Sequence, residues 1–471
     1  MANLAVMKFG GTSVGDAAGI CRAAEIIAST AREQPVVAVV SAMSGITNAL
    51  IAAAGNSATG DQNAAIEIAE ALRLRHHAVI DATIKAEARR TELSAEIDRI
   101  VAGVGELCHG TALLRELTPR TLAAISTAGE RLSARLLAAA LCELAITSLA
   151  IDATEVIVTD DDYARPEPLM KETCVRATAR LLPLLEEGVT PVVTGFIGAT
   201  TKGIVTTLGR GGSDYSATIL GATLEADKII IWTDVDGVLT ADPRLVPQAR
   251  LLSEISYNEA AELAYFGAKV LHPKTLRPVA DSLIPVWIRN SSAPERAGTK
   301  ITRRGQPSEN GVKAITAMTN VSLITVGGRG IVGVIGVAAK TFAAAASVRA
   351  NVLLISQSSS ESDICFVVDS GDAERTLGSL KKSFAADLLH HHVEHIAVNP
   401  DIAVIAAVGE NMRGTPGIAG RLFSALGRRG VNVIAIAQGS SEYNVSFVVE
   451  AAAMQDAAIA IHEEFDLGRA S

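Results

Sequence analysis

Lys8-Phe-Gly-Gly-Thr-Ser-Val14 is the first of two glycine-rich stretches that decide the fold class of this chain, and Gly209-Arg-Gly-Gly-Ser-Asp214 is the second. Each stretch follows a short apolar, β-favouring run and precedes an alanine-rich helical pattern, which predicts strand, tight turn and helix. Such a turn exposes backbone N–H groups at the positive end of a helix dipole, where a phosphate binds favourably. With the cations Lys8 and Arg210, the two turns indicate a nucleotide-dependent phosphotransferase.

The first three hundred residues alternate strand-like and helix-like segments. Continuous apolar runs, typical of strands buried on both faces, lie at 35–41, 189–193, 229–233 and 284–288. Long amphipathic helical patterns between them include 67–100 and 119–144. These patterns predict an α/β fold in which helices cover both faces of a mostly parallel sheet. A Pro-, Gly- and Ser-rich stretch at 291–310 predicts that this first domain, residues 1–300, ends there.

The rest of the chain contains an internal duplication. Residues 351–368 align with residues 432–449 at an offset of 81 residues. Each copy reads as strand, glycine loop, helix, strand, polar turn and strand, and two such units should pair their sheets side by side. We therefore predict one domain over 311–400 and another over 401–471.

Composition excludes several classes of protein. A chain of 471 residues is too long for a single core, and 49% apolar with 20% charged residues indicates a folded protein. The net charge of −9 argues against nucleic acid or an anionic membrane as the main partner. Five scattered cysteines without CxxC spacing suggest a reducing compartment. The chain begins with no signal-peptide pattern and has no convincing membrane span, so we expect a cytoplasmic protein.

Two further motifs have weaker interpretations. Gly328-Arg-Gly-Ile-Val-Gly333 matches the dinucleotide-binding pattern, but no acidic residue ends the following strand and the second copy does not keep the spacing. The cluster of His390, His391, His392 and His395 could bind a metal, although an exposed helix end or loop is its natural interpretation. We predict neither a dinucleotide site nor protein metal ligands.

The chain has no P-loop and no protein-kinase HRD or DFG element. Six motifs in order instead resemble the aspartate kinases of the amino acid kinase superfamily. They lie at 8–14, 41–48, 194–198, 207–215, 232–237 and 266–273. The duplicated part resembles the paired ACT domains of that family, so the resemblance covers essentially the whole chain.

The resemblance implies an amino acid kinase fold followed by two ferredoxin-like βαββαβ ACT domains. It implies that ATP, with Mg²⁺, phosphorylates the β-carboxylate of L-aspartate to 4-phospho-L-aspartate, the first step of lysine, threonine and methionine biosynthesis. Lys8 would offset the charge of the transferring phosphoryl group, and Asp214 would orient the catalytic cluster.

The same resemblance assigns the binding residues. Those that match the aspartate site are Thr47, Glu130, Phe196, Arg210 and Ser213, with Arg210 on the α-carboxylate and Glu130 on the ammonium. Those that match the ATP site are Lys8, Gly10, Gly11, Thr233, Asp234, Arg244 and Lys269. Leu239 departs from the family, whose members often carry tyrosine there.

Simpler local interpretations compete with two of these roles. Arg210 and Asp214 are four residues apart and could form an ordinary helix ion pair. Glu130, on an amphipathic pattern, could be a solvated surface residue.

ACT pairs in this family bind an end-product amino acid and usually build a homodimer. The candidate effector residues are Ile355, Gln357, Ser358, Ser359, Asn432 and Gln438. Glutamine at both equivalent positions resembles the threonine-responsive kinases linked to homoserine dehydrogenase, so we expect threonine as effector, with lysine second. The alternative is that the pair serves dimerisation alone. Because the chain stops at Ser471, shortly after the second repeat, we expect a monofunctional enzyme.

Two other functions remain open at this point. One is a kinase for glutamate or N-acetylglutamate. The predicted set Thr47, Glu130 and Arg210 would bind both a free amine and an α-carboxylate, which argues against an acetylated substrate. A non-catalytic amino-acid sensor is the other, but it should have lost Lys8 or Asp214, and both are present.

Overall fold

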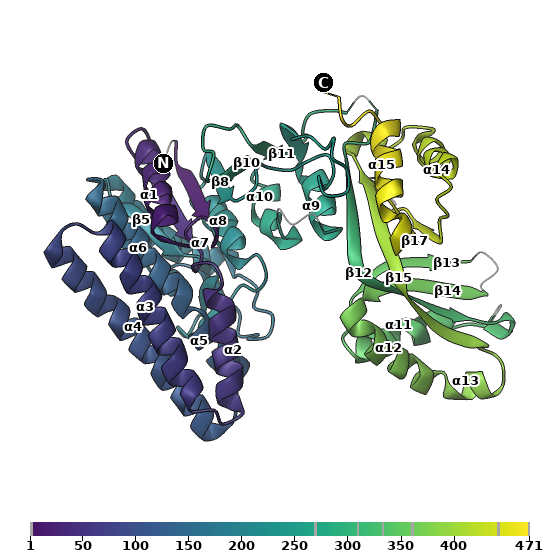
Figure 1. Cartoon of the computed structure of the whole chain (residues 1–471), viewed down its shortest axis with the longest axis horizontal. Helices are drawn as coiled ribbons and strands as arrows, with labels where there is room; N and C mark the ends of the chain where they lie inside the picture. Colours follow the sequence, from purple (N-terminus) through teal and green to yellow (C-terminus); the bar gives the residue numbers. More distant parts are fainter. Residues whose placement is uncertain are drawn as a thin grey trace. The chain divides into compact units, whose positions relative to one another are not determined.

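The computed structural model describes residues 3–267, 271–308, 310–331, 334–358, 362–439 and 443–469. The chain forms two compact units (Figure 1). The first unit comprises Met1–Val238, Leu251–Tyr257 and Val270–Gly305. The second comprises Leu239–Arg250, Asn258–Lys269 and Gln306–Ser471, so two segments that interrupt the first unit in sequence belong with the second.

The first unit is built on an eight-stranded sheet with the order β3-β5-β2-β1-β8-β10-β11-β9. Its strands are β1 (Ala5–Phe9), β2 (Val36–Val40), β3 (Ser148–Ile151), β5 (Thr190–Thr194), β8 (Lys228–Thr233), β9 (Glu254–Ser256), β10 (Val286–Asn290) and β11 (Thr299–Thr302). Every neighbouring pair is parallel except β10 with β11. The predicted mostly parallel sheet is confirmed, and its strand ends gather loops at one edge.

Helices cover both faces of this sheet because its central strands are apolar on both sides. All five residues of β1 and of β2 are buried. One face packs against α1 (Ala17–Ala31), α2 (Ile46–Ala58), α3 (Asn63–Thr83), α4 (Glu87–Leu114), α5 (Pro119–Ser126) and α6 (Ala128–Glu143). On the other face α8 (Gly212–Thr223) packs against β1, β2 and β8, and α7 (Met170–Glu186) and α10 (Arg277–Ala280) pack against α8. Helix α9 (Tyr257–Tyr265) begins in the first unit and continues in the second.

The long amphipathic stretches are helical, but each is divided. Residues 84–86 separate α3 from α4, with extended backbone at Ile84 and Ala86, and the two helices lie side by side (Figure 1). In the second stretch, Thr127 ends α5 and also precedes α6. A helical period gives the face of a helix that is buried, but it does not reveal where the axis turns.

The second glycine stretch follows a strand outside the main sheet. Strands β4 (Val158–Thr159), β6 (Ile197–Thr200) and β7 (Val205–Thr207) form a separate three-stranded sheet, in which β6 and β7 are antiparallel. The glycine turn at 209–211 therefore leaves β7 and enters α8.

The second unit contains a six-stranded antiparallel sheet with the order β13-β14-β12-β15-β17-β16. Its strands are β12 (Ala314–Gly327), β13 (Val352–Gln357), β14 (Asp363–Asp369), β15 (His395–Val408), β16 (Ala435–Ala437) and β17 (Asn444–Glu450). Its helices are α11 (Val337–Ser347), α12 (Ser370–Ser383), α13 (Ala385–Leu389), α14 (Ile418–Arg428) and α15 (Met454–Glu464).

The predicted duplication is visible in this unit. The series α11-β13-β14-α12 and α14-β16-β17-α15 have the same order, and Val337 corresponds to Ile418 at the offset of 81 residues. Each copy has its own core, with edge-to-face phenylalanine pairs at equivalent positions, Phe342–Phe366 and Phe423–Phe447. The long strands β12 and β15 pair with each other and join the two copies into one sheet.

The two weaker motifs lie in the second unit, and the first of them is described only in part. Arg329–Ile331 forms a short 3-10 helix, and residues 332–333 lie outside the described range. His392 Nδ1 lies 3.8 Å from Asp387, and His395 Nε2 lies 3.9 Å from Asp363. Within the described ranges there is no group of three or more potential metal ligands, and no helix is long and apolar enough to cross a membrane.

Candidate active site

The first unit contains a cavity of about 340 Å³ at the ends of its strands. It is lined by Lys8, Gly11, Ser41, Ala42, Met43, Ser44, Gly45, Thr47, Asn48, Glu130, Phe196, Gly209, Gly211, Gly212, Ser213 and Asp214. Strand β1, the loops after β1, β2, β5 and β7, and the first turns of α2, α6 and α8 supply these residues. The cavity thus brings together seven predicted site residues from distant parts of the sequence, namely Lys8, Gly11, Thr47, Glu130, Phe196, Ser213 and Asp214.

Lys8 supplies a fixed, buried cation to this cavity. It belongs to the central strand β1 and is 7% exposed. Its Nζ lies 2.5 Å from Oδ1 of Asp214, in the first turn of α8. Asp214 therefore pairs with Lys8, and no ion pair joins it to Arg210 in the described structure, so the alternative of a local helix ion pair is wrong.

Gly11 allows the turn after β1 to pack against the turn after β2. A Cβ on Gly11 would lie 2.8 Å from the carbonyl oxygen of Ala42. The backbone N–H of Ser44 donates to the Gly11 carbonyl at 3.0 Å, and that of Gly10 donates to the Trp232 carbonyl at 3.1 Å. This close approach explains why a small residue stands at position 11. The predicted role of both glycines at phosphate stays a prediction.

Glu130 is a buried acid at the cavity, so the alternative of a solvated surface residue is wrong. It is 3% exposed and lies in the first turn of α6. The preceding Gly129 lets α6 reach the turn after β2, since a Cβ there would lie 2.6 Å from the Ala42 Cβ. The Glu130 carboxylate accepts the Ala42 backbone N–H, but burial outweighs this bond and raises the pKa of Glu130 to about 8. Its Oε2 has no hydrogen-bond partner among the described residues.

Phe196 contributes a wall of the cavity from a strained loop between β5 and β6. Its φ of +66° is left-handed, which costs a residue with a Cβ about 1 kcal/mol or more. The Phe196 N–H donates to Ser216 Oγ of α8 at 3.0 Å, which holds the loop against the helix that carries Ser213. Packing, rather than local preference, therefore sets this wall.

Other predicted residues lie outside the cavity lining. Arg210 is exposed in the turn before α8. Thr233 ends β8, and Asp234 accepts a hydrogen bond from its hydroxyl at 3.2 Å. Arg244 and Leu239 belong to the second unit, where Arg244 is exposed and pairs with Asp242 at 2.6 Å. Lys269 lies outside the described residues.

Three polar residues that line the cavity belong to the motif at 41–48 but were assigned no role there, namely Ser41, Ser44 and Asn48. A signal for them existed, because Ser41 is the first polar residue after the fully buried β2. Polar side chains at the end of a buried parallel strand commonly face a ligand site.

The candidate effector residues that the structure describes lie on or close to β13 and β16, the equivalent strands of the two copies. Gln357 ends β13 and Gln438 follows β16, and both are exposed, as are Ile355 and Asn432. Ser358 Oγ accepts the backbone N–H of Asp363 at 3.1 Å, and Ser359 lies outside the described residues. The strands β13 and β16 also approach each other, so the two sets of residues belong to one region of the second unit.

Comparison with known families gives two matches. Residues 3–290 match the profile described as the amino acid kinase family. Residues 324–384 and 405–465 both match an ACT domain profile, and the two matches are offset by the same 81 residues as the internal repeat.

Known relatives match over nearly the whole chain. A bifunctional aspartokinase/homoserine dehydrogenase of Haemophilus influenzae is 35% identical over 97% of this chain and 56% of its own length. The chloroplastic aspartokinase 1 of Arabidopsis thaliana is 33% identical over 98% of this chain and 80% of its own. The chain spans about half the length of the bifunctional relatives that it matches.

A solved structure has the same fold. Crystal structures of E. coli aspartokinase III, in complex with aspartate and ADP and in complex with lysine and aspartate, are 32% identical to this chain. They cover 98% of this chain and 99% of their own, with a TM-score of 0.80.

Proposed function

Because this chain belongs to the amino acid kinase family, among aspartokinases with paired ACT domains, we propose that it phosphorylates the β-carboxylate of L-aspartate with ATP. The product would be 4-phospho-L-aspartate, the first intermediate toward lysine, threonine and methionine. The observation that carries the proposal is a single cavity that contains a buried lysine, held by Asp214, and a buried acid with a free oxygen. The first suits a phosphoryl group and the second an ammonium group.

The chemistry requires positioning and charge more than proton transfer. A β-carboxylate, with a reference pKa of about 3.9, is ionised at neutral pH, so no general base is needed. A carboxylate oxygen attacks the γ-phosphorus, the bond from that phosphorus to the β–γ bridging oxygen breaks, and ADP leaves with the electron pair. Two anions must approach each other, and this repulsion has to be offset by cations. Lys8 supplies such a charge in a fixed place.

The other lining residues fit recognition of a free amino acid. Glu130 would pair with the ammonium, while Thr47, Phe196 and Ser213 shape the surrounding wall. Arg210, exposed beside the cavity, would bind the α-carboxylate through two parallel N–H donors, a geometry that the guanidinium favours.

The nucleotide is proposed to bind at the neighbouring turns after β1 and β8. Gly10 is hydrogen-bonded to Trp232, so the glycine turn lies next to Thr233 and Asp234. Gly11 belongs to the same turn, and the ATP-binding roles of Arg244 and Lys269 stay predictions. Mg²⁺ commonly keeps its waters and is held by substrate phosphates with one or two carboxylates. The cavity offers few carboxylates, Asp214 among them, which fits an ion that arrives with ATP and adds positive charge at the phosphates.

The site argues against the two competing functions. An acetylated amino acid has no ammonium to satisfy the free oxygen of Glu130. A sensor without catalysis would have no need for a buried Lys8–Asp214 pair. Glutamate is one methylene longer than aspartate, and turnover measured with each of the two substrates distinguishes them.

Regulation and assembly are proposed for the second unit. Threonine is the favoured effector and lysine the second, and a relative has been solved with lysine. Ile355 and Ile436 occupy equivalent positions on edge strands and are 50% and 46% exposed. Exposed apolar residues on edge strands are typical of an interface, which supports a homodimer through the ACT domains. Free cysteines fit a cytoplasmic enzyme.

Effector sensitivity can be measured on the proposed reaction itself. ADP release with Mg²⁺-ATP should require L-aspartate, should not occur with L-glutamate, and should fall when threonine is added. Stronger inhibition by lysine would reverse the order of the two effectors. Turnover insensitive to both would leave the ACT pair an assembly role, and turnover with glutamate alone would overturn the proposed substrate.

The binding of aspartate should depend on pH through Glu130. Since the pKa of Glu130 is about 8 in the empty site, its carboxyl is neutral at pH 6 and cannot pair with an ammonium. The KM for aspartate should therefore fall by up to about tenfold per pH unit from pH 6 and level off above pH 8. Initial rates at pH 6 to 8.5 measure this, and Glu130→Gln should flatten the profile.

The Glu130 carboxyl should also make the stability of the folded protein depend on pH, in the direction opposite to that of most carboxylates. Its folded-state pKa lies above the unfolded value, so the folded protein retains a proton that the unfolded chain releases. Its contribution to stability is therefore present below the unfolded pKa and is lost as the pH rises to about 8.

A wild-type KM that is flat from pH 6 to 8.5 would contradict the assignment of Glu130.

A further inference from the structure

We propose that the ion pair between Arg131 and Asp152 positions Glu130, and that both residues are therefore positioning residues for aspartate. The inference rests on the proposed function and adds to it two residues outside the cavity. It follows from how the first turn of α6 is held.

The turn that carries Glu130 has no local cap. Thr127, at its start, has helical backbone angles and makes no side-chain capping bond to α6. Its hydroxyl donates instead to the Ala124 carbonyl at 3.2 Å, back toward α5. A side-chain cap usually satisfies free N–H groups and fixes the first turn of a helix. Here the turn is held on one side by the packing of Gly129 against Ala42, and a side-chain contact holds it on the other.

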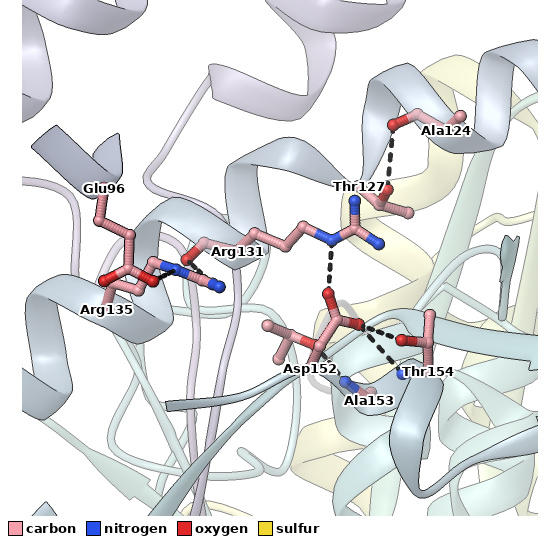
Figure 2. Close-up of polar contacts among 9 residues, drawn as sticks. Glu96, Ala124, Thr127, Arg131, Arg135, Asp152, Ala153 and Thr154 are labelled. Atoms are coloured by element: carbon pink, nitrogen blue, oxygen red, sulfur yellow. Dashed lines mark hydrogen bonds and ion pairs between the residues drawn. The ribbon is translucent and has the colours of Figure 1, made fainter. Parts of the chain in front are cut away.

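Arg131, the next residue after Glu130, makes that contact (Figure 2). Its Nε donates to Oδ2 of Asp152 at 2.6 Å, and the two side chains are 26% and 19% exposed. Asp152 follows β3 and caps η1 (Ala153–Glu155) with its other oxygen. That Oδ1 accepts the backbone N–H of Thr154 at 3.0 Å and its hydroxyl at 2.8 Å. Asp152 is thus itself held rigidly.

The same segment is tied to the opposite wall of the cavity. The backbone N–H of Ala153 donates to Thr194 Oγ1 at 2.8 Å in a buried hydrogen bond. Thr194 is the last residue of β5, and Phe196 of the cavity wall lies two residues further on. A continuous series of polar contacts therefore runs from the turn with Glu130, through Asp152, to the loop with Phe196.

One turn further along α6, a second ion pair serves as a natural control (Figure 2). Arg135 pairs with Glu96 of α4, and its Nη1 donates to the Arg131 carbonyl at 3.0 Å. This pair is also half-buried, but Glu96 belongs to a helix that contributes nothing to the cavity lining. Both pairs therefore support α6. They differ in that Asp152 belongs to a segment hydrogen-bonded to the strand before the cavity wall, whereas Glu96 belongs to a helix that does not line the cavity.

The positioning matters because Glu130 is buried. A carboxylate away from water binds an ammonium well only when the two groups meet in good geometry, since neither can be compensated by solvent. Small displacements of a binding group are costly to catalysis for the same reason. Loss of the Asp152 contact should therefore weaken aspartate binding more than it slows the chemical step.

The test compares two matched carboxylate-to-amide variants in the full chain. Asp152→Asn should raise the KM for aspartate about tenfold, with kcat and the KM for ATP within about twofold. Glu96→Gln should leave all three within about twofold, even where both variants lower the melting temperature equally. In a Glu130→Gln background, Asp152→Asn should add little, because the group that it positions is already altered.

The outcomes separate this inference from the proposed function. Equal effects of Asp152→Asn and Glu96→Gln on the KM, or full additivity with Glu130→Gln, would overturn the positioning role alone. A wild-type protein without aspartate turnover would overturn the proposed function and this inference with it. If Asp152→Asn does not fold, Arg131→Met removes the same pair from the helix side and leaves the cap of η1 intact, with the same expected KM.

Discussion

Lys8→Met is expected to lower kcat by at least about a hundredfold while the KM for aspartate changes little, because Lys8 acts on charge that develops during transfer. The side chain is buried in the central strand and held by Asp214 at 2.5 Å, so it needs no reorganisation when the phosphoryl group moves. Methionine keeps the length and the apolar stem but removes the cation. Steady-state rates with saturating Mg²⁺-ATP give the ratio.

Two control variants separate charge from folding. Lys8→Arg keeps the positive charge and should retain more activity than Lys8→Met. Lys8→Met with Asp214→Asn removes both charges, so it should recover stability that the single variant loses by leaving a carboxylate unpaired, but not activity. A kcat for Lys8→Met within about tenfold of wild type would contradict electrostatic stabilisation by Lys8.

Glu130→Gln should raise the KM for aspartate about a hundredfold at pH 8.5, where the wild-type carboxyl is charged, with a smaller effect on kcat. The substitution keeps the shape of a side chain that is 3% exposed, and it removes the charge that would pair with the ammonium. The reacting β-carboxylate lies at the other end of the substrate, so binding suffers more than chemistry.

Succinate, which lacks the amine, provides the matched substrate. The wild type should turn over aspartate much faster than succinate. Glu130→Gln should reduce this ratio, because the variant no longer pairs with the ammonium group by which the two substrates differ. An unchanged ratio of aspartate to succinate turnover would show that Glu130 does not contact the ammonium.

Much of the fold could be predicted because its signals are local. Val36–Val40 is apolar at every position, which only a strand buried on both faces requires. The first glycine turn was recognisable because Gly10 and Gly11 directly follow a buried strand, β1, whose fourth residue is Lys8. The repeat could be detected directly, as aligned residues at an offset of 81 positions. The equivalent phenylalanine pairs show that the two copies also share their core packing.

The remainder depends on contacts between distant segments. That Asp214 pairs with Lys8 rather than with Arg210 is decided by how α8 packs on β1, and no spacing in the sequence encodes this. The burial of Glu130 similarly depends on the close approach of Gly129 to Ala42. The segments 239–250 and 258–269 belong to the second unit because of their tertiary contacts, although their sequence neighbours lie in the first.

Trapping of the reaction product tests the central claim most directly. The full chain would be incubated with Mg²⁺-ATP, L-aspartate and hydroxylamine, and the hydroxamate identified by its retention and mass against α- and β-aspartyl standards. The account predicts β-aspartyl hydroxamate in a one-to-one ratio with ADP. ADP release without hydroxamate, or hydroxamate formed only from glutamate, would contradict it.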